Sequence, residues 1–502
     1  MGLFDNLVLG FEVALTWQAL WFCFMGVSVG MFIGVLPGIG PLAAISMLLP
    51  LTYYTTPTNA LIMLAGIYYG SQYGGSVSSI LLRLPGEAST AITAIDGYEM
   101  TRKGRAGAAL LITTVASFVG GTIGIILMTA FAPLLADLAL SFGSAEMFAL
   151  MVAGLTAASA LTDGSPVKGF AMVAIGLIVG IVGMDVTTGV MRFTYDQIEL
   201  LDGVNLVAAA LGLFGVSEIL ANIGQPQAKE VVTRKVTLRS MMPTWQETRD
   251  AIPATLRGSA AGVLFGILPG AGATISSFFS YAVEKRFSRN RDRLGTGAVE
   301  GVAGPEAANN AAAQTAFIPA LTLGIPGNPL MALMLGAMIV HGVAPGARML
   351  TNTPDVFWGL VASFWIGNLM LLILNIPLIG IWVRMLTVPY RLLYPAIMLL
   401  IVIGVYSVNN SVFDIYVLVF FGLLGYAMRL LGFSPAPLVL GLVLGPMLED
   451  NLRRSLMLSD GDYSIFVTRP ISCGLLVLTV LLIALALQRA WVGKAMAPAG
   501  DD

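Results

Sequence analysis

Two segments of the sequence share an unusual pattern of glycine and proline. Residues 34–40 read GVLPGIG and residues 266–272 read GILPGAG, 232 positions apart, and both lie within apolar stretches. Proline lacks the amide hydrogen that a helix interior needs, and glycine adopts backbone conformations that other residues avoid. Each segment is therefore expected to interrupt a helix. The amide groups exposed at such an interruption suit a carboxylate, whereas the exposed carbonyl groups suit a cation.

A second pair of interruptions follows the first pair in the same order. LRLPGE (82–87) follows the first segment and LGIPGN (323–328) follows the second, 241 positions apart. Polar residues lie beside both, in GSQYGGSVSS (70–79) and EAANNAAAQT (306–315). One isolated Pro-Gly is commonly only a helix kink. Paired interruptions at matching positions of two halves instead indicate the binding site of a secondary transporter.

The composition identifies the class of protein that holds these segments. Of the 502 residues, 57% are hydrophobic and 11% are charged, and the mean hydropathy is +0.86. Soluble domains carry about 25% charged residues. We therefore expect an all-α polytopic membrane protein with re-entrant hairpins, broken helices and about 10–12 membrane segments. The net charge of −2 gives no indication of nucleic-acid binding.

The matched segments divide the chain into two repeats. Two further features recur in the same order: residues 145–154 resemble residues 394–404, and LTDGSP (161–166) aligns with YSVNNS (406–411). We expect four parts, which are a first repeat at 1–222, a polar cytoplasmic linker at 223–253, a second repeat at 254–490 and a polar C-terminal tail at 491–502.

Basic residues indicate that the two repeats have opposite orientations. Loops rich in lysine and arginine stay cytoplasmic. TRKGR (101–105) is basic where its counterpart is nearly neutral, and VEKRFSRNRDR (283–293) is basic where TYYTTPTN (52–59) is neutral. This alternation predicts inverted repeats, with GILPGAG at the tip of a hairpin that enters and leaves on one side. Arg453 and Arg454 are the exception, because this arrangement places them outside.

Ionisable residues near the interruptions are candidates for function, since charge within a membrane is costly. Arg83 could face an anionic substrate, reach the interface or pair with Glu87. Glu306 could act in transport or pair with a loop arginine. Asp163 could be an ion site or a helix cap. Asp96 is expected in a turn near the cytoplasmic surface.

The sequence resembles one family over nearly its whole length. The segments GVLPGIGPL, YYGSQYGGSVSSILLRLPGEAST, AIDGYEMTRKGRAG and NNAAAQTAFIPALTLGIPG are similar to those of the large membrane subunit (TctA type) of tripartite tricarboxylate transporters. The resemblance implies uptake of organic carboxylates across a bacterial inner membrane, driven by an ion gradient. It also implies two partners, a periplasmic solute-binding protein and a small membrane subunit.

These patterns predict one site between the hairpins and the Pro-Gly segments, near the middle of the lipid bilayer. Substrate is expected at Pro37, Gly38, Gly40, Pro85, Gly86, Glu87, Ser89, Pro269, Gly270, Gly272, Pro326, Gly327 and Asn328. The coupling ion, Na+ (or H+), is expected at Ser78, Ser79, Thr274, Ser276 and Asn310. Alternating access would follow from moving the hairpins against the rest of the protein, and an elevator motion is one form of this.

Two other functions stay open from the sequence. A carboxylate channel, or an exporter that needs no binding protein, would transport without the tripartite assembly, and a channel would require a continuous pore. An intramembrane enzyme would need a nucleophile and a base, but the chain has a single histidine, His341, and no Walker-type loop. We therefore expect no enzymatic activity and no cofactor besides the coupling ion.

Overall fold

Helices joined by loops form the structure, together with one small hairpin of strands. The computed structural model describes residues 2–36, 40–160, 165–185, 188–223, 238–268, 272–385 and 390–495. Strands β1 (Gly183–Met184) and β2 (Met191–Arg192) pair antiparallel, with Gly183 opposite Arg192. The predicted all-α polytopic membrane fold is confirmed. The strand hairpin is a feature that the sequence pattern did not indicate.

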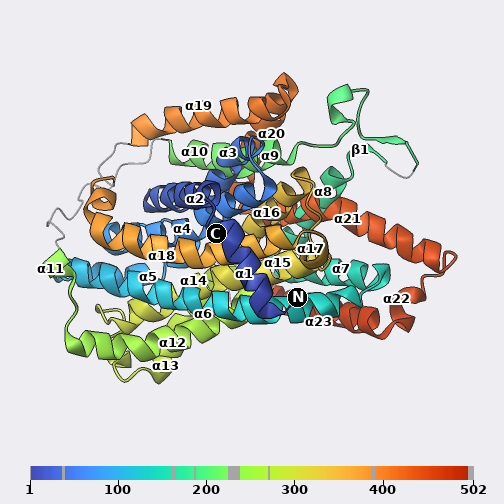
Figure 1. Cartoon of the computed structure of the whole chain (residues 1–502). Coiled ribbons are helices and arrows are strands. Elements are labelled where there is room, and N and C mark those ends of the chain that lie inside the picture. Colours follow the sequence, from blue (N-terminus) through green and yellow to red (C-terminus); the bar gives the residue numbers. More distant parts are fainter. Residues whose placement is uncertain are drawn as a thin grey trace.

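Figure 1 shows the helices along the chain, and the division into two repeats stays a prediction. Those before the linker are α1 (Leu3–Ala14), α2 (Trp17–Val35), α3 (Pro41–Thr52), α4 (Pro57–Leu82), η1 (Ala88–Thr90), α5 (Thr93–Arg102), α6 (Ala106–Leu140), α7 (Ser144–Ala160), α8 (Pro166–Gly180), η2 (Ile198–Leu200), α9 (Leu206–Ala210), the π-helical η3 (Leu211–Val216) and α10 (Ser217–Asn222). The later helices begin with α11 (Leu238–Met241), which lies within the segment expected as linker, and continue with α12 (Trp245–Ile267), α13 (Gly272–Phe287), η4 (Arg291–Arg293), α14 (Glu300–Thr315), α15 (Phe317–Leu323), α16 (Pro329–Val340), α17 (Met349–Asn352), α18 (Pro354–Met385), α19 (Tyr390–Asn409), α20 (Val412–Leu430), α21 (Ala436–Leu458), α22 (Ile465–Thr468) and α23 (Pro470–Ala495).

Length and composition distinguish helices that could cross a membrane from apolar helices that are too short to do so. Among the described residues, five helices are long and apolar enough to cross a membrane, namely α2, α6, α18, α20 and α23. Six further apolar stretches of 10–17 residues are helical but shorter. Such short helices are typical of hairpins and broken helices, which do not cross the full bilayer. The number of membrane segments stays a prediction.

Glycine backbones join α2 closely to α4. Gly26, Gly30 and Gly34 recur every four residues and so form one stripe along α2. A Cβ atom at any of them would collide with a backbone carbonyl oxygen of α4, at Met63, Ile67 and Ser71 respectively. Small residues allow membrane helices to approach in this way, so this contact depends on the absence of side chains.

The same packing joins α12 to α14. Here Gly258, Gly262 and Gly266 of α12 meet the carbonyl oxygens of Gly304, Ala308 and Ala312. These glycines lie 232 positions after their counterparts in α2, and their partners lie 241 positions after their counterparts in α4. The two spacings equal those of the matched Pro-Gly segments. The sequence repeat is thus a repeat of helix contacts, whereas the inverted orientation of the halves stays a prediction.

The broken helices end in the same backbone conformation in both halves. α4 ends at Arg83, whose φ of 59° and ψ of 22° are left-handed, and α15 ends at Gly324, with φ of 69° and ψ of 22°. The Pro-Gly pair follows each of them. Glu87 and Asn328 then cap the next helical turn in an extended conformation. Arg83, which has a side chain, adopts at this helix end a conformation that glycine favours.

Three basic segments lie at one end of the molecule. Arg105 forms an ion pair with Glu247 at the start of α12, and Lys103 Nζ donates to the carbonyl oxygen of Thr296 at 2.5 Å. The TRKGR loop, the end of the linker and the loop after α13 therefore share one face, as their basic character predicts. Figure 1 shows α11 on this side and β1 at the opposite end of the long helices.

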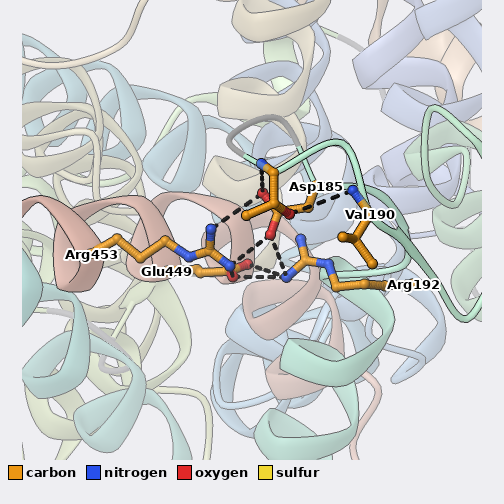
Figure 2. A network of polar contacts seen from close by, with 6 residues as sticks. Asp185, Val190, Arg192, Glu449 and Arg453 are labelled. Atoms are coloured by element: carbon orange, nitrogen blue, oxygen red, sulfur yellow. Dashed lines mark hydrogen bonds and ion pairs between the residues drawn. The ribbon is translucent and has the colours of Figure 1, made fainter.

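Arg453, the exception to the charge pattern, is compensated by acidic residues. It lies on α21, 2.7 Å from Asp185 and 2.7 Å from Glu449, and Arg192 of β2 also lies 2.7 Å from Glu449 (Figure 2). Both carboxylates therefore bridge two arginines and fix the strand hairpin to α21. The charge of Arg453 is balanced within the fold, so its position beside the strand hairpin costs little free energy.

Two parts of the sequence interpretation differ from the structure. Asp96 lies inside α5 and is fully buried, rather than in an exposed turn. Its carboxylate accepts hydrogen bonds from the backbone amides of Gly295, Gly297 and Ala298, and so orders the loop before α14. In addition, α12 begins at Trp245, within the segment expected as linker, because Thr244 and Glu247 form a capping box there.

Candidate functional site

Matched segments of both halves line one cavity of about 570 Å³. Gly40, Pro41 and Leu42, at the end of the first GxLPGxG segment, line it together with Gly272, Ala273 and Thr274, at the end of the second. Pro85–Ser89 and Gly327–Leu330 contribute the two Pro-Gly segments. The pairs keep the spacings of 232 and 241 positions. The cavity is large enough for a small organic molecule, and each half supplies the same two elements to it.

Three helices begin at this cavity. α3 starts after Gly40, α13 starts at Gly272, and α16 starts after Asn328, whose side-chain oxygen accepts from the amide of Met331 at 2.9 Å. The first amide groups of a helix lack partners within it, and the helix dipole places about half a positive charge there. Proline at the first position of α3 and α16 suits a helix start. The cavity wall thus offers several positive helix ends to an anion.

One positively charged side chain also faces the cavity. Arg429, at the end of α20, is the single lysine or arginine among the described lining residues, and it pairs with Glu218 of α10. Glu218 follows the π-helical segment η3, which supplies Phe214 to the cavity wall. Such π-helical segments occur frequently at functional sites.

A carboxylate also lines this cavity, at the end of the first Pro-Gly segment. Glu87 lines the cavity, and its Oε1 atom has no hydrogen-bond partner among the described residues. Ser89 Oγ lies 3.4 Å from Glu87 Oε2 and 2.9 Å from Gln72 Oε1. Glu87 would repel a substrate carboxylate unless a cation or a proton compensates its charge.

The structure brings together most of the residues predicted to contact substrate. Gly40, Pro85, Gly86, Glu87, Ser89, Gly272, Gly327 and Asn328 all line the cavity. Pro326 is buried and is absent from the described lining. Pro37, Gly38, Pro269 and Gly270 lie outside the described residues, as does Asp163.

The residues predicted to hold the coupling ion are more dispersed. Thr274 lines the cavity. The hydroxyl groups of Ser78 and Ser276 donate to carbonyl oxygens of their own helices, and that of Ser79 donates to Thr90 at 2.9 Å. The Asn310 amide donates to the Glu306 carbonyl oxygen. Serine in a helix often bonds to the preceding turn in this way.

Arg83 lies away from the cavity. Its guanidinium is 6.0 Å from the centre of the Tyr98 ring, its side chain is exposed, and it forms no ion pair with Glu87 among the described residues. The alternative of a surface position therefore fits the structure better than contact with substrate. Arg429 and Glu218, in contrast, were missed, although charged residues at the ends of apolar stretches are a signal that could have found them.

Comparison with known proteins agrees with these observations. A sequence model of the "Tripartite tricarboxylate transporter TctA family" matches residues 20–440. A relative from Agrobacterium vitis, named "Uncharacterized 52.8 kDa protein in TAR-I ttuC' 3'region", is 50% identical over 490 residues, which cover 97% of each chain. A second, "Uncharacterized protein in TAR-II ttuC' 3'region" from the same organism, is 57% identical over 226 residues, 45% of this chain and 93% of the relative. No solved structure matches. The chain is therefore a member of the TctA family of tripartite tricarboxylate transporters.

Proposed function

We propose that this chain is the translocating subunit of a secondary active transporter that imports organic di- and tricarboxylates through a bacterial inner membrane. The observation that carries the proposal is the cavity in which three helix N-termini and Arg429 surround a space of about 570 Å³. Helix N-termini and arginine are the groups that proteins use to bind carboxylates. Two or three carboxylates of one substrate could each meet a different positive group.

We infer cation coupling from Glu87, the acidic residue of the described lining that is not paired with Arg429, as Glu218 is. A substrate with two or three negative charges would lie beside Glu87, which adds a further negative charge. Binding of Na+ or H+ together with the substrate reduces this repulsion. A cation gradient would then drive accumulation of the carboxylate, because the cation improves substrate binding and is carried with it.

The position of the cavity supports alternating access between two groups of helices. The ends of the GxLPGxG segments and the Pro-Gly segments supply one group of lining residues, and α7, α10, α20 and α21 supply another, through Ala158, Glu218, Arg429 and Leu440. Movement of the first group along the second would carry the bound substrate across the membrane, as in an elevator mechanism. A periplasmic binding protein would deliver the substrate, and a small membrane subunit would complete the assembly.

Uptake into proteoliposomes tests the proposal. We expect labelled tri- or dicarboxylate to accumulate above its external concentration when a cation gradient, the small subunit and the binding protein are supplied. Equilibration without a gradient and without the binding protein would instead favour the channel, which is the alternative function. Absence of uptake for every di- and tricarboxylate tested, with correctly inserted protein, would contradict the proposal.

Asn328 provides a specific test of the positive helix ends at the cavity. Asn328→Asp keeps an oxygen that caps α16 but adds a negative charge, so we expect an unchanged melting temperature and weaker carboxylate binding. Asn328→Ala removes the cap and should cost about 1 kcal/mol of stability. Thermal unfolding and the half-saturating substrate concentration are the measurements. An Asn328→Asp variant with wild-type half-saturation would argue against substrate at this helix end.

A further inference from the structure

A fully buried carboxylate lies behind the cavity wall, at Glu306 of α14. Ser76 of α4 donates to its Oε2 atom at 2.5 Å, and Thr93 of α5 donates to its Oε1 atom at 2.6 Å. The ion pairs that the described residues form all involve other carboxylates. A buried charge without an opposite charge is unfavourable by several kcal/mol, so this carboxylate requires a cation or a proton.

Two further polar side chains approach the same carboxylate. Ser117 of α6 and Asn309 of α14 lie beside Glu306 and are fully buried. Both side chains reach the Glu306 carboxylate, but the described residues form no well-aligned hydrogen bond with the Ser117 hydroxyl or with either polar atom of the Asn309 side chain. Buried polar atoms in native proteins almost always have well-formed partners. The oxygen atoms of Ser117 and Asn309 are therefore available to a ligand beside Glu306.

Too few hydrogen atoms are available around Glu306 to satisfy every oxygen there. Ser76 has one hydroxyl hydrogen, but its Oγ atom lies 3.0 Å from the carbonyl oxygen of Gln72 and 2.5 Å from Glu306 Oε2. When Ser76 donates to Gln72, two oxygens face each other with no hydrogen between them. A cation bound by both oxygens turns this repulsion into attraction.

Neighbouring charged groups already have partners of their own. On α5, Asp96 accepts from loop amides and from Tyr281 of α13. Glu284 of α13 pairs with Arg257 of α12. Glu300, earlier on α14, accepts from Ser288 and Asn290, and Tyr73 of α4 donates to Asn368. Glu87, which lines the cavity, likewise forms no ion pair among the described residues. Glu306 is thus the carboxylate outside the cavity lining that these surroundings leave uncompensated.

We propose that Glu306, Ser76, Thr93, Ser117 and Asn309 form the binding site for the Na+ ion that is co-transported with substrate. All five provide oxygen atoms, the ligands that hard cations prefer. One carboxylate balances one positive charge, which favours a monovalent over a divalent cation. A proton would satisfy one oxygen pair, whereas a cation can be bound by the oxygen atoms of Ser117 and Asn309 as well. The proposal rests on the proposed function and names the coupling ion of that site.

The repeat itself singles out this position. The position 241 residues before Glu306 is Ala65, so the second half carries a charge that the first half lacks. Three glycine contacts in each of the two helix pairs match around this position. The carboxylate of Glu306 is therefore an addition of the second half to a shared packing arrangement.

A short polar connection links this site to the cavity. Gln72 lines the cavity and accepts from Ser89, and its backbone carbonyl lies one helical turn from Ser76. Residues 85–93 contribute Glu87 and Ser89 to the cavity and Thr93 to the proposed Na+ site. Binding of Na+ orders Thr93 and hence this segment, so each ligand should raise the affinity for the other by the same factor.

Equilibrium binding of radioactive Na+ to the purified full chain tests the site. We expect wild type to bind Na+, Glu306→Gln to lose binding, and Ser117→Ala to weaken it about 10-fold or more, since lost metal contacts commonly cost this much. Thr114→Val is the matched control, because Thr114 lies one turn from Ser117 and its hydroxyl bonds only to the Leu110 carbonyl oxygen among the described residues. Size-exclusion profiles and thermal unfolding in K+ verify that each variant is folded.

The outcomes separate this proposal from the proposed function. Unchanged Na+ affinity in folded Glu306→Gln and Ser117→Ala would overturn the site. A wild-type protein that binds no Na+ and takes up carboxylate with a pH gradient alone would overturn it in favour of a proton. Na+ binding that depends on Glu306, in a protein that transports no carboxylate, would support the site and reject the proposed function.

Discussion

Replacement of Gly86 by alanine should abolish carboxylate uptake. A Cβ atom at Gly86 would collide with the Gly34 carbonyl oxygen and lie 2.6 Å from the Cα atom of Gly75. Three segments meet here, namely the end of α2, the interior of α4 and the first Pro-Gly segment. Neither of these two atoms can rotate away, because both belong to the backbone. We expect a loss of about 1–3 kcal/mol of stability and uptake below about a tenth of wild type.

The matched control for this substitution is Gly380→Ala. Gly380 lies in α18, and a Cβ atom there would meet nothing within 4 Å. Uptake and thermal unfolding should both match wild type. Gly86→Ala protein with wild-type uptake and melting temperature would show that the Pro-Gly segment does not pack against α2 and α4 as described.

Removal of the positive charge at Arg429 should weaken substrate binding strongly. Hydrogen bonds to charged groups contribute about 1.5–3 kcal/mol, so Arg429→Gln should raise the half-saturating carboxylate concentration about 10- to 100-fold. Glu218→Gln should have the opposite effect. Its carboxylate pairs with Arg429, so its loss leaves more of the guanidinium charge for the substrate.

Changes of opposite sign in the half-saturating concentration, for Arg429→Gln and Glu218→Gln, distinguish a substrate contact from a structural ion pair. If the pair only joined α10 to α20, both substitutions would lower stability and neither would lower the half-saturating concentration. Initial uptake rates over a range of substrate concentrations measure the effect. Arg429→Lys keeps the charge but not the planar geometry, so it should retain part of the affinity. An equal loss of carboxylate affinity in Arg429→Gln and Glu218→Gln would contradict the assignment of Arg429 as a substrate contact.

The matched interruptions and their spacings were predictable from the sequence. Glycine and proline act on the backbone locally, so GVLPGIG and GILPGAG indicate helix breaks wherever they occur in apolar segments. The spacings of 232 and 241 positions then relate contacts such as Gly34 with Ser71 and Gly266 with Ala312. The shared face of the basic loops followed from charge alone.

Residues that act across helices were harder to predict. The choice of Ser78, Ser79 and Ser276 for the ion depends on where each hydroxyl points, and it stays a prediction. The hydroxyls of Ser78 and Ser276 donate to carbonyl oxygens of their own helices, and that of Ser79 donates to Thr90. The surroundings of Glu306 in α14 are likewise contributed by α4, α5 and α6, which are distant from α14 in sequence, so spacing gave no indication of them. Asp96 was misjudged because its Asp-Gly pair is typical of turns, whereas tertiary contacts hold it within α5.

The central claim is that equivalent segments of both halves form one carboxylate site, and cysteine protection tests it most directly. Ala88 and Ala273 line the cavity from opposite halves. Each would be replaced by cysteine in turn, in protein in which Cys23 and Cys473 are replaced by alanine. The measured quantity is the rate of thiol labelling as a function of carboxylate concentration, with Na+ present. The account predicts that substrate slows labelling at both positions with the same half-maximal concentration. Protection at one position alone, or at neither, in protein that still transports would contradict it.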